Sequence, residues 1–162
     1  MLKNKIIRIF AILPLILVIF LFSTTDVKAY SVSQAECVIE LESRRILSST
    51  NKDLKLPMAS TTKILTALTV IENFDINKSI CVKKSSTNIE GSSIYLKEGE
   101  NLTVKELLFG LMLRSGNDCA ECLAESLIDR KSFIDLMNKT AKDCGALNSN
   151  FTNPHGLHDD NH

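Results

Sequence analysis

One almost wholly apolar, helix-forming segment constrains the fold of this chain more than any other feature. Residues 107–113 read Leu-Leu-Phe-Gly-Leu-Met-Leu, directly after a capping box at residues 103–106, Thr-Val-Lys-Glu. Residues 114–117, Arg-Ser-Gly-Asn, then break the pattern. A helix this apolar is poorly suited to a surface position, so we expect it to lie in the core.

Three further helices and a few short strands are expected around this segment. The helices are predicted at residues 60–73, at 118–127 with Asp118 as N-cap, and at 132–143 with Ser132 as N-cap and Gly145 as the stop. The strands are predicted as a hairpin at 36–41 and 45–48, with short extended pieces at 79–86 and 93–97. Because isolated two-stranded ribbons are marginal, either the helices carry the fold or the sheet is incomplete. We therefore expect an α+β fold, a helical cluster with an incomplete antiparallel sheet.

The N-terminal residues 1–29 have the three parts of a secretory signal peptide. Three basic residues precede the apolar stretch 9–22, and a polar segment then ends in Val-Lys-Ala at 27–29. The apolar stretch is shorter than the ~20 residues of a spanning helix and contains Pro14. We expect cleavage after Ala29, which leaves residues 30–162 to work outside the cytoplasmic membrane. An uncleaved anchor is the alternative.

Charge and cysteine content argue against nucleic-acid binding, a disulfide framework and a metal site. The formal net charge is zero, so no basic excess points to nucleic acid as a partner. Five cysteines at irregular spacing make a poor disulfide framework in an exported chain. Cys119 and Cys122 could join His155 and His158 in a metal site, but the histidine spacing is too short for a usual zinc finger. We expect small buried thiols, with no metal and no cofactor.

Ser60 and Lys63 form a compact candidate for acyl-transfer chemistry. They lie three residues apart at the start of a predicted helix, so they share one face. A serine needs an adjacent base to become a nucleophile, and a desolvated lysine can lose its proton near neutral pH. The spacing alone is weak, because Ser49 and Lys52 repeat it in a polar stretch without an apolar helix. The plain alternative for Ser60 is an ordinary N-cap.

A second candidate element is the break between two predicted helices at Ser115, Gly116 and Asn117. A hydroxyl and a carboxamide held in a rigid loop can relay a proton and fix an amide substrate. The alternative is a plain turn, since these three residue types are common in turns.

Taken together, four segments in a fixed order resemble a known family. They are residues 57–63 (Pro-Met-Ala-Ser-Thr-Thr-Lys), 91–100 (Gly-Ser-Ser-Ile-Tyr-Leu-Lys-Glu-Gly-Glu), 111–118 (Leu-Met-Leu-Arg-Ser-Gly-Asn-Asp) and 153–157 (Asn-Pro-His-Gly-Leu). The chain is similar in them to the penicillin-recognising serine enzymes, and in particular to secreted D-alanyl-D-alanine carboxypeptidases, the low-molecular-weight penicillin-binding proteins. The resemblance covers residues 34–162.

The resemblance implies a fold, a reaction and roles for four residues. The fold is that of penicillin-binding proteins and β-lactamases, and the substrate is a peptidoglycan peptide ending in D-Ala-D-Ala, with β-lactams as covalent inhibitors. Ser60 would be the acylated nucleophile and Lys63 its proton acceptor. Ser115 would relay the proton to the leaving D-alanine, and Asn117 would bind the substrate amide. The backbone N–H of Ser60 would supply half of the oxyanion hole.

One family motif has no counterpart in the sequence. The Lys-Thr-Gly or Lys-Ser-Gly motif expected on a later strand does not occur, and Lys139-Thr140-Ala141 lies in a helical pattern without the glycine. We therefore expect the N-terminal part of such an enzyme, at residues 30–162, with little or no activity of its own. The alternatives are a class A-like β-lactamase, for which Glu121 and Glu125 are poor candidates because they suit a surface helix, and a non-catalytic wall-binding remnant. Membrane association is left open.

Overall fold

The computed structural model describes residues 33–162, and the signal-peptide prediction at 1–29 lies outside them. The chain divides into two compact units, Met1–Leu54 and Lys55–His162, which are described separately. Among the described residues no helix is long and apolar enough to cross a membrane.

The described part of the first unit is the expected hairpin. Strand β1 (Glu36–Ile39) pairs antiparallel with β2 (Ile46–Thr50), and the register shifts at Val38 and Ile39. Every strand residue is exposed to solvent within the structure. The hairpin is therefore confirmed as a ribbon without a buried face of its own.

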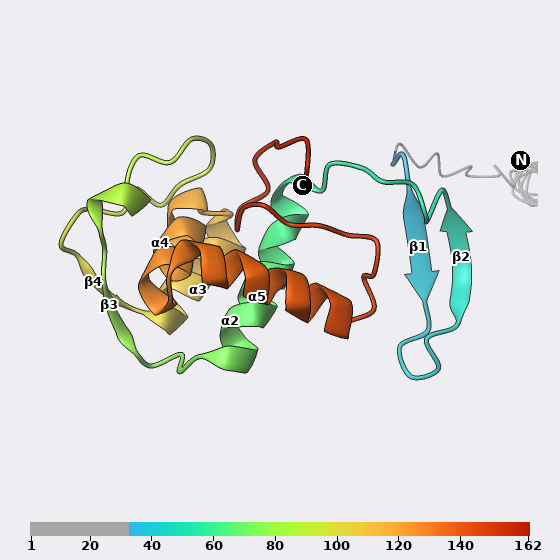
Figure 1. Cartoon of the computed structure of the whole chain (residues 1–162), viewed down its shortest axis with the longest axis horizontal. Helices are drawn as coiled ribbons and strands as arrows, with labels where there is room; N and C mark the ends of the chain where they lie inside the picture. Colours follow the sequence, from blue (N-terminus) through green and yellow to red (C-terminus); the bar gives the residue numbers. More distant parts are fainter. Residues whose placement is uncertain (1–32) are drawn as a thin grey trace, which may run out of the picture. The chain divides into compact units, whose positions relative to one another are not determined.

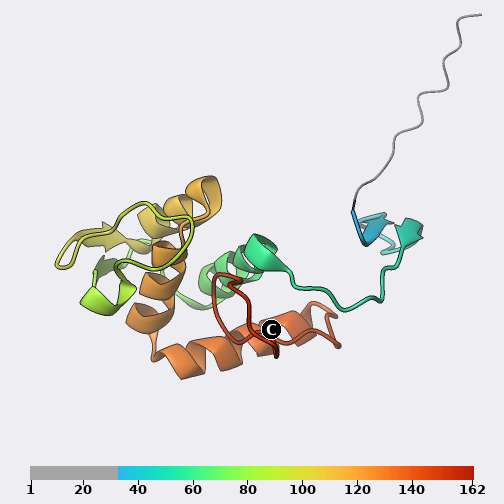
Figure 2. The ribbon, with the colours of Figure 1, turned by 90° about the horizontal axis from the view of Figure 1, so that it is seen from above.

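The second unit is a cluster of helices with one small ribbon beside it (Figure 1). Its elements are η1 (Ala59–Thr61), α2 (Thr62–Asn73), β3 (Ser79–Cys81), η2 (Lys84–Ser86), β4 (Asn101–Thr103), α3 (Val104–Arg114), α4 (Asn117–Leu127) and α5 (Arg130–Asp143). Helix α5 packs against both α2 and α4, and α3 packs against α4 and α2 (Figure 2). The segment after α5 runs back to the start of α2, where His162 and Thr62 are hydrogen-bonded through Nε2 and Oγ1.

The apolar segment that dominates the sequence is only half buried. Leu107 and Leu111 of α3 are 0% and 1% exposed and pack in the core with side chains of the other helices. Phe109 and Leu113, however, are 54% and 77% exposed. The expectation of a core helix is thus correct for one face and wrong for the other, because the described neighbours α2, α4 and β4 cover only one side of it.

The predicted start is right for α3, whereas α2, α4 and α5 begin at other residues than predicted. Thr103 and Glu106 form the capping box of α3. Helix α5 begins earlier than predicted, because Asp129, not Ser132, is its N-cap and accepts from the Ser132 N–H. Helix α4 has Gly116 as N-cap, so the expectation for Asp118 was wrong.

Asp118 instead organises the loop before α3, and this explains a missing strand. Its fully buried carboxylate accepts from the Ser93 hydroxyl and from the backbone N–H groups of Ile94 and Leu96. Those N–H groups are consequently not available to a strand ladder, and 93–97 forms no strand. The partner of β3 is β4, with Ile80 opposite Leu102.

The cysteines divide into two classes. Cys119 and Cys122 of α4 are fully buried, as predicted. Cys37, Cys81 and Cys144 are exposed, so burial was a wrong expectation for them. All five thiols are free in the described part of the chain.

Candidate active site

The side chains of Ser60 and Lys63 meet as the spacing predicts. Ser60 lies in the 3-10 turn η1, which continues directly into α2 with Lys63 in the first turn. Lys63 Nζ donates to Ser60 Oγ at 3.1 Å. The N-cap of α2 is Thr61, so the interpretation of Ser60 as an ordinary cap of this helix is wrong. The serine is exposed, whereas the lysine is 2% exposed.

Burial lowers the pKa of the Lys63 amine. Removal from water disfavours the ammonium ion, and burial is the main reason that the pKa of Lys63 is lowered from its ordinary value. The neighbouring Cys119 acts in the opposite direction. That opposition is weak, because burial raises the pKa of the Cys119 thiol and keeps it uncharged. A buried amine beside an exposed hydroxyl is the arrangement of a base and a nucleophile.

The repeated spacing at Ser49 and Lys52 has a different environment. Lys52 is exposed and pairs with Asp53 at 2.6 Å, and no hydrogen bond to Ser49 is formed in the described structure. The Asp53 carboxylate raises the pKa of Lys52. An exposed ammonium paired with an acid cannot act as a base at neutral pH, so this pair is not a candidate site.

Ser115 and Asn117 lie at the break between α3 and α4, as predicted. Ser115 ends α3 in the left-handed conformation, with φ of 55°. Asn117 is 4% exposed, and its Nδ2 donates to the Glu90 carbonyl at 2.6 Å. Within the described residues neither side chain is hydrogen-bonded to Ser60 or Lys63. Their predicted catalytic roles therefore stay predictions.

A buried loop at residues 153–157 completes the surroundings of Lys63, and sequence reasoning missed it. The backbone carbonyl of His155 accepts from Lys63 Nζ at 2.9 Å, and the Pro154 carbonyl accepts from Thr66 Oγ1 at 2.7 Å. His155 is 7% exposed, although the tail that contains it is mostly polar in sequence. The Asn-Pro-His-Gly-Leu segment was the available signal, because it carried the family resemblance without an assigned role.

Glu121 also departs from its predicted surface position. It is 8% exposed and forms two hydrogen bonds with the Arg130 guanidinium, both at 2.8 Å. His155 Nε2 lies 3.0 Å from the same carboxylate. Burial by itself raises the pKa of Glu121, but the hydrogen bonds from His155 and Arg130 outweigh it and lower that pKa to about 2. The helix periodicity around Glu121 predicted the position on α4 but not the two partners.

The structure also contains a cavity formed by the segment before β4. It has a volume of about 570 Å³, and its lining residues lie between positions 87 and 98 and include Gly91, Tyr95 and Lys97. It does not include Ser60, and no buried titratable group lines it. We therefore assign the candidate site from the Ser60–Lys63 geometry and not from this cavity.

Comparisons with known proteins identify the family to which this chain is similar. Residues 23–162 match the family model for D-alanyl-D-alanine carboxypeptidase. The D-alanyl-D-alanine carboxypeptidase DacF of Bacillus subtilis is 35% identical over 136 residues, which cover 80% of this chain and 35% of that protein. The chain thus spans about a third of the length of this relative.

Solved structures show the same relationship. The D-alanyl-D-alanine carboxypeptidase DacD from Francisella tularensis is 31% identical, with a TM-score of 0.75 over 83% of this chain and 34% of that one. Penicillin binding protein 5 from Haemophilus influenzae is 28% identical, with a TM-score of 0.73 over 83% of this chain and 42% of that one. The expected α+β fold of penicillin-binding proteins is therefore confirmed. With the Ser60–Lys63 pair in place at the start of α2, the chain belongs to the D-alanyl-D-alanine carboxypeptidase family.

Proposed function

We propose that Ser60 is the acylated nucleophile of a serine-type D-Ala-D-Ala carboxypeptidase, and that Lys63 is its proton acceptor. The substrate is a peptidoglycan stem peptide ending in D-Ala-D-Ala. The observation that carries the proposal is the 3.1 Å hydrogen bond between Lys63 Nζ and Ser60 Oγ, made by an amine whose pKa is lowered by burial.

The proposed reaction assigns one step to each of these groups. Ser60 Oγ attacks the carbonyl carbon of the penultimate D-alanine while its proton passes to Lys63, and the terminal D-alanine leaves with a proton relayed through Ser115. Water then hydrolyses the ester. Asn117 holds the substrate amide: since its Nδ2 is bound to the Glu90 carbonyl, its Oδ1 is the atom to accept the substrate N–H. The Ser60 N–H contributes to the oxyanion hole.

A fluorescent penicillin tests the nucleophile directly, because opening of the β-lactam ring leaves an ester on the serine. We expect one adduct at Ser60, found by mass spectrometry of peptides, and none in Ser60→Ala or Lys63→Ala. The matched control is Ser49→Ala, which removes the exposed serine of the same spacing and should label like the parent chain. Labelling that persists in Ser60→Ala contradicts the proposal. A folded parent chain that does not label favours the non-catalytic wall-binding alternative.

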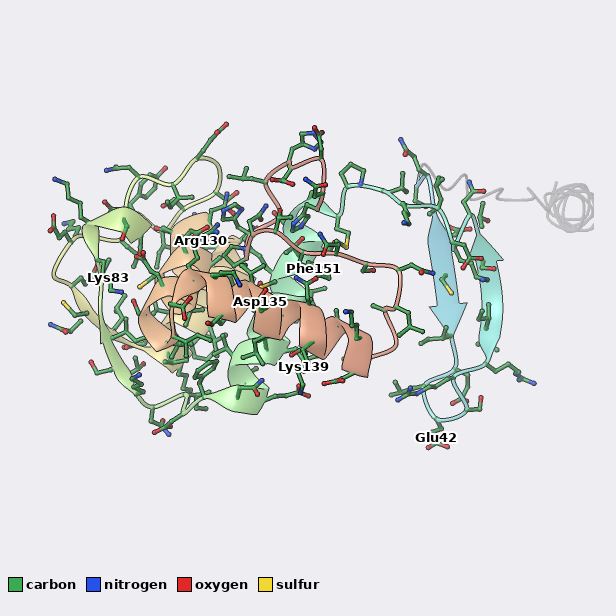
Figure 3. All side chains as sticks on the ribbon, in the orientation of Figure 1. Glu42, Lys83, Arg130, Asp135, Lys139 and Phe151 are labelled. Carbon is green, nitrogen blue, oxygen red and sulfur yellow. The ribbon has the colours of Figure 1, made fainter. Side chains whose placement is uncertain are left out.

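Release of D-alanine from a peptide substrate requires more of the site than acylation by penicillin does. The 162 residues do not include the Lys-Thr-Gly motif, and Lys139, Thr140 and Ala141 lie in α5 (Figure 3 labels Lys139). Loss of one oxyanion donor alone lowers turnover about 10²- to 10³-fold. We expect the 162-residue polypeptide to release D-alanine from a D-Ala-D-Ala peptide slowly or not at all. Ordinary turnover in that assay refutes this expectation.

The β-lactamase alternative receives less support from the site. A class A enzyme uses a glutamate to activate the deacylating water. Both oxygens of Glu121 are bound by Arg130 and His155, and Glu125 binds Ser85 at 2.7 Å. Neither carboxylate is free to activate water, so we expect a stable penicillin adduct instead of rapid turnover of the antibiotic.

The proposed place of action is the outer side of the cytoplasmic membrane, in the cell wall. The support is the charge and hydropathy pattern of residues 1–29. N-terminal sequencing of the exported protein is expected to begin at Tyr30. A mature protein that retains residues 1–29 supports the uncleaved anchor, and with it membrane association.

A further inference from the structure

A buried carboxylate cluster lies behind the proposed base. Glu121 of α4 is bound on one side by Arg130, at the start of α5, and on the other by His155 of the loop 153–157 (Figure 3 labels Arg130). Glu121 and His155 are 8% and 7% exposed. A buried charge is costly unless it is paired and hydrogen-bonded, and even a paired one contributes little to stability. We therefore ask what else the Glu121 carboxylate does.

The hydrogen bonds of the His155 ring define its tautomer. Nδ1 accepts the backbone N–H of Leu157 at 3.1 Å, which leaves the proton on Nε2, and Nε2 lies 3.0 Å from Glu121 Oε1. The ring nitrogen therefore donates to the carboxylate. On the backbone side Asn153 Oδ1 accepts the N–H groups of His155 at 3.2 Å and Gly156 at 2.7 Å. The loop is thus held both through its backbone and through the His155 ring.

The same histidine connects this cluster to the proposed base. Its backbone carbonyl accepts from Lys63 Nζ at 2.9 Å, and the neighbouring Pro154 carbonyl accepts from Thr66 Oγ1 one turn further along α2. A displacement of the His155 ring therefore moves the carbonyl that orients the amine. A chain of contacts thus runs from the Glu121 carboxylate on α4 through His155 to Lys63 on α2.

We propose that Glu121 is a positioning residue: by holding the His155 ring, it fixes the His155 carbonyl that aims Lys63 Nζ at Ser60 Oγ. This inference rests on the proposed role of Lys63 as proton acceptor. Arg130 assists by binding both carboxylate oxygens and fixing their direction, as a bidentate guanidinium does. In the described structure the partners of Glu121 are Arg130 and His155, and it forms no hydrogen bond with Ser60 or Lys63.

The test compares Glu121→Gln with Glu125→Gln in the full chain. Glu125 is on the same helix, one turn further on, and its carboxylate binds Ser85 and Ser86, away from the loop 153–157. Three quantities are measured at one pH. They are the melting temperature, the rate of acylation by fluorescent penicillin, and the rate at which a small amine-reactive compound modifies Lys63. The modification is read by peptide mass spectrometry, with the exposed Lys131 as internal standard.

A positioning role predicts a change at Lys63 and not merely a loss of stability. In Glu121→Gln we expect Lys63 modification to rise about tenfold, because loss of a charged hydrogen bond releases the loop that covers the amine. Acylation should fall about tenfold, since a small misplacement of a catalytic group is costly. Glu125→Gln should change neither rate, at a comparable change in melting temperature.

The outcomes separate this inference from the proposed function. If both variants lose stability while Lys63 modification stays at the parent rate, Glu121 is only structural and the inference is overturned. If modification rises in Glu121→Gln but the parent chain is never acylated, the positioning of Lys63 stands and its proposed catalytic use fails. Should Glu121→Gln not fold, Arg130→Gln decides, because its half-exposed side chain is less critical to folding. Unchanged Lys63 modification in that variant also overturns the inference.

Discussion

Gly156 offers the sharpest test of how the site is assembled. This glycine has a φ of +86°, and a Cβ placed on it would lie 1.8 Å from the Ala59 carbonyl oxygen. Real Cβ atoms essentially never come closer than 3.0 Å to such an atom. Gly156→Ala therefore requires the loop 153–157 or the turn that bears Ser60 to move apart by the difference, about 1.2 Å.

That displacement is large compared with the change in length that the hydrogen bonds of Lys63 Nζ can tolerate. His155 precedes Gly156, and Ser60 follows Ala59, so the movement acts directly on the two acceptors of Lys63 Nζ, now at 2.9 and 3.1 Å. An increase of about 1.2 Å takes either contact out of hydrogen-bond range. A misplacement of about 1 Å can cost 10²-fold in rate, so we expect acylation by penicillin to fall by about that factor. The left-handed backbone adds ~1–2 kcal/mol to the loss of stability.

Gly145→Ala is the matched control. Gly145 has a φ of +90°, and nothing lies within 4 Å of the position that a Cβ would take there, so this variant carries only the backbone cost. Both variants are compared by denaturant unfolding and by penicillin acylation. We expect a loss of ~1–2 kcal/mol with unchanged acylation for Gly145→Ala, and a clearly larger loss for Gly156→Ala. Equal losses of stability in the two variants refute the close approach of the loop to Ala59.

Three further predictions concern buried polar and crowded positions. Asp118→Asn should lower the free energy of unfolding by ~3 kcal/mol, because an amide accepts hydrogen bonds poorly in place of a fully buried carboxylate. Hydrogen exchange of the N–H groups in 94–96 should become faster, and unchanged exchange contradicts this. Gly110→Ala should destabilise the chain by on the order of 1 kcal/mol, since its Cβ would lie 2.6 Å from Cys119 Sγ. In a double-mutant cycle Cys119→Ala should restore part of this loss, and additive losses rule the contact out. Glu121, with a pKa lowered from 4.5 to about 2, is protonated first in the unfolded chain as the pH falls, so stability should drop by on the order of 3 kcal/mol between about pH 5 and pH 2. Glu121→Gln should lack this component of the acid unfolding curve, and an unchanged curve is the contrary result.

Features set by residues close in the chain were predictable from the sequence. The capping box at Thr103 and Glu106, the hairpin of the first unit and the meeting of Lys63 with Ser60 all depend on neighbours within a few positions. Their physical causes are helix capping, helix periodicity and a turn between two strand-forming segments, which the sequence displays directly. The shifted start of α5 belongs to the same class, because Asp129 and Ser132 are both good caps and the helix uses Asp129.

Features set by distant pairings were missed. Asp118 looked like a cap, but its partners lie in 93–96, more than twenty residues earlier. Glu121 looked solvated because its partner in the tail, His155, has no fixed sequence relation to it. Helix periodicity reports which face a residue occupies, but not which distant loop covers that face. The exposed side of α3 is the converse case, where apolar residues predict burial and the described neighbours do not cover them.

The two Ser-x-x-Lys sequences show what the long-range contacts add. Ser49 and Lys52 have the same spacing as Ser60 and Lys63, yet only the second pair is hydrogen-bonded. In the second pair the amine is buried, and its other acceptor is the backbone carbonyl of His155, 92 residues away. The spacing brings the hydroxyl within reach of the amine, and the packing around the amine lowers the pKa of Lys63, as the proposed role of a base requires. Reactivity at Ser60 should consequently follow the integrity of the loop 153–157, even in variants that leave both Ser60 and Lys63 unchanged.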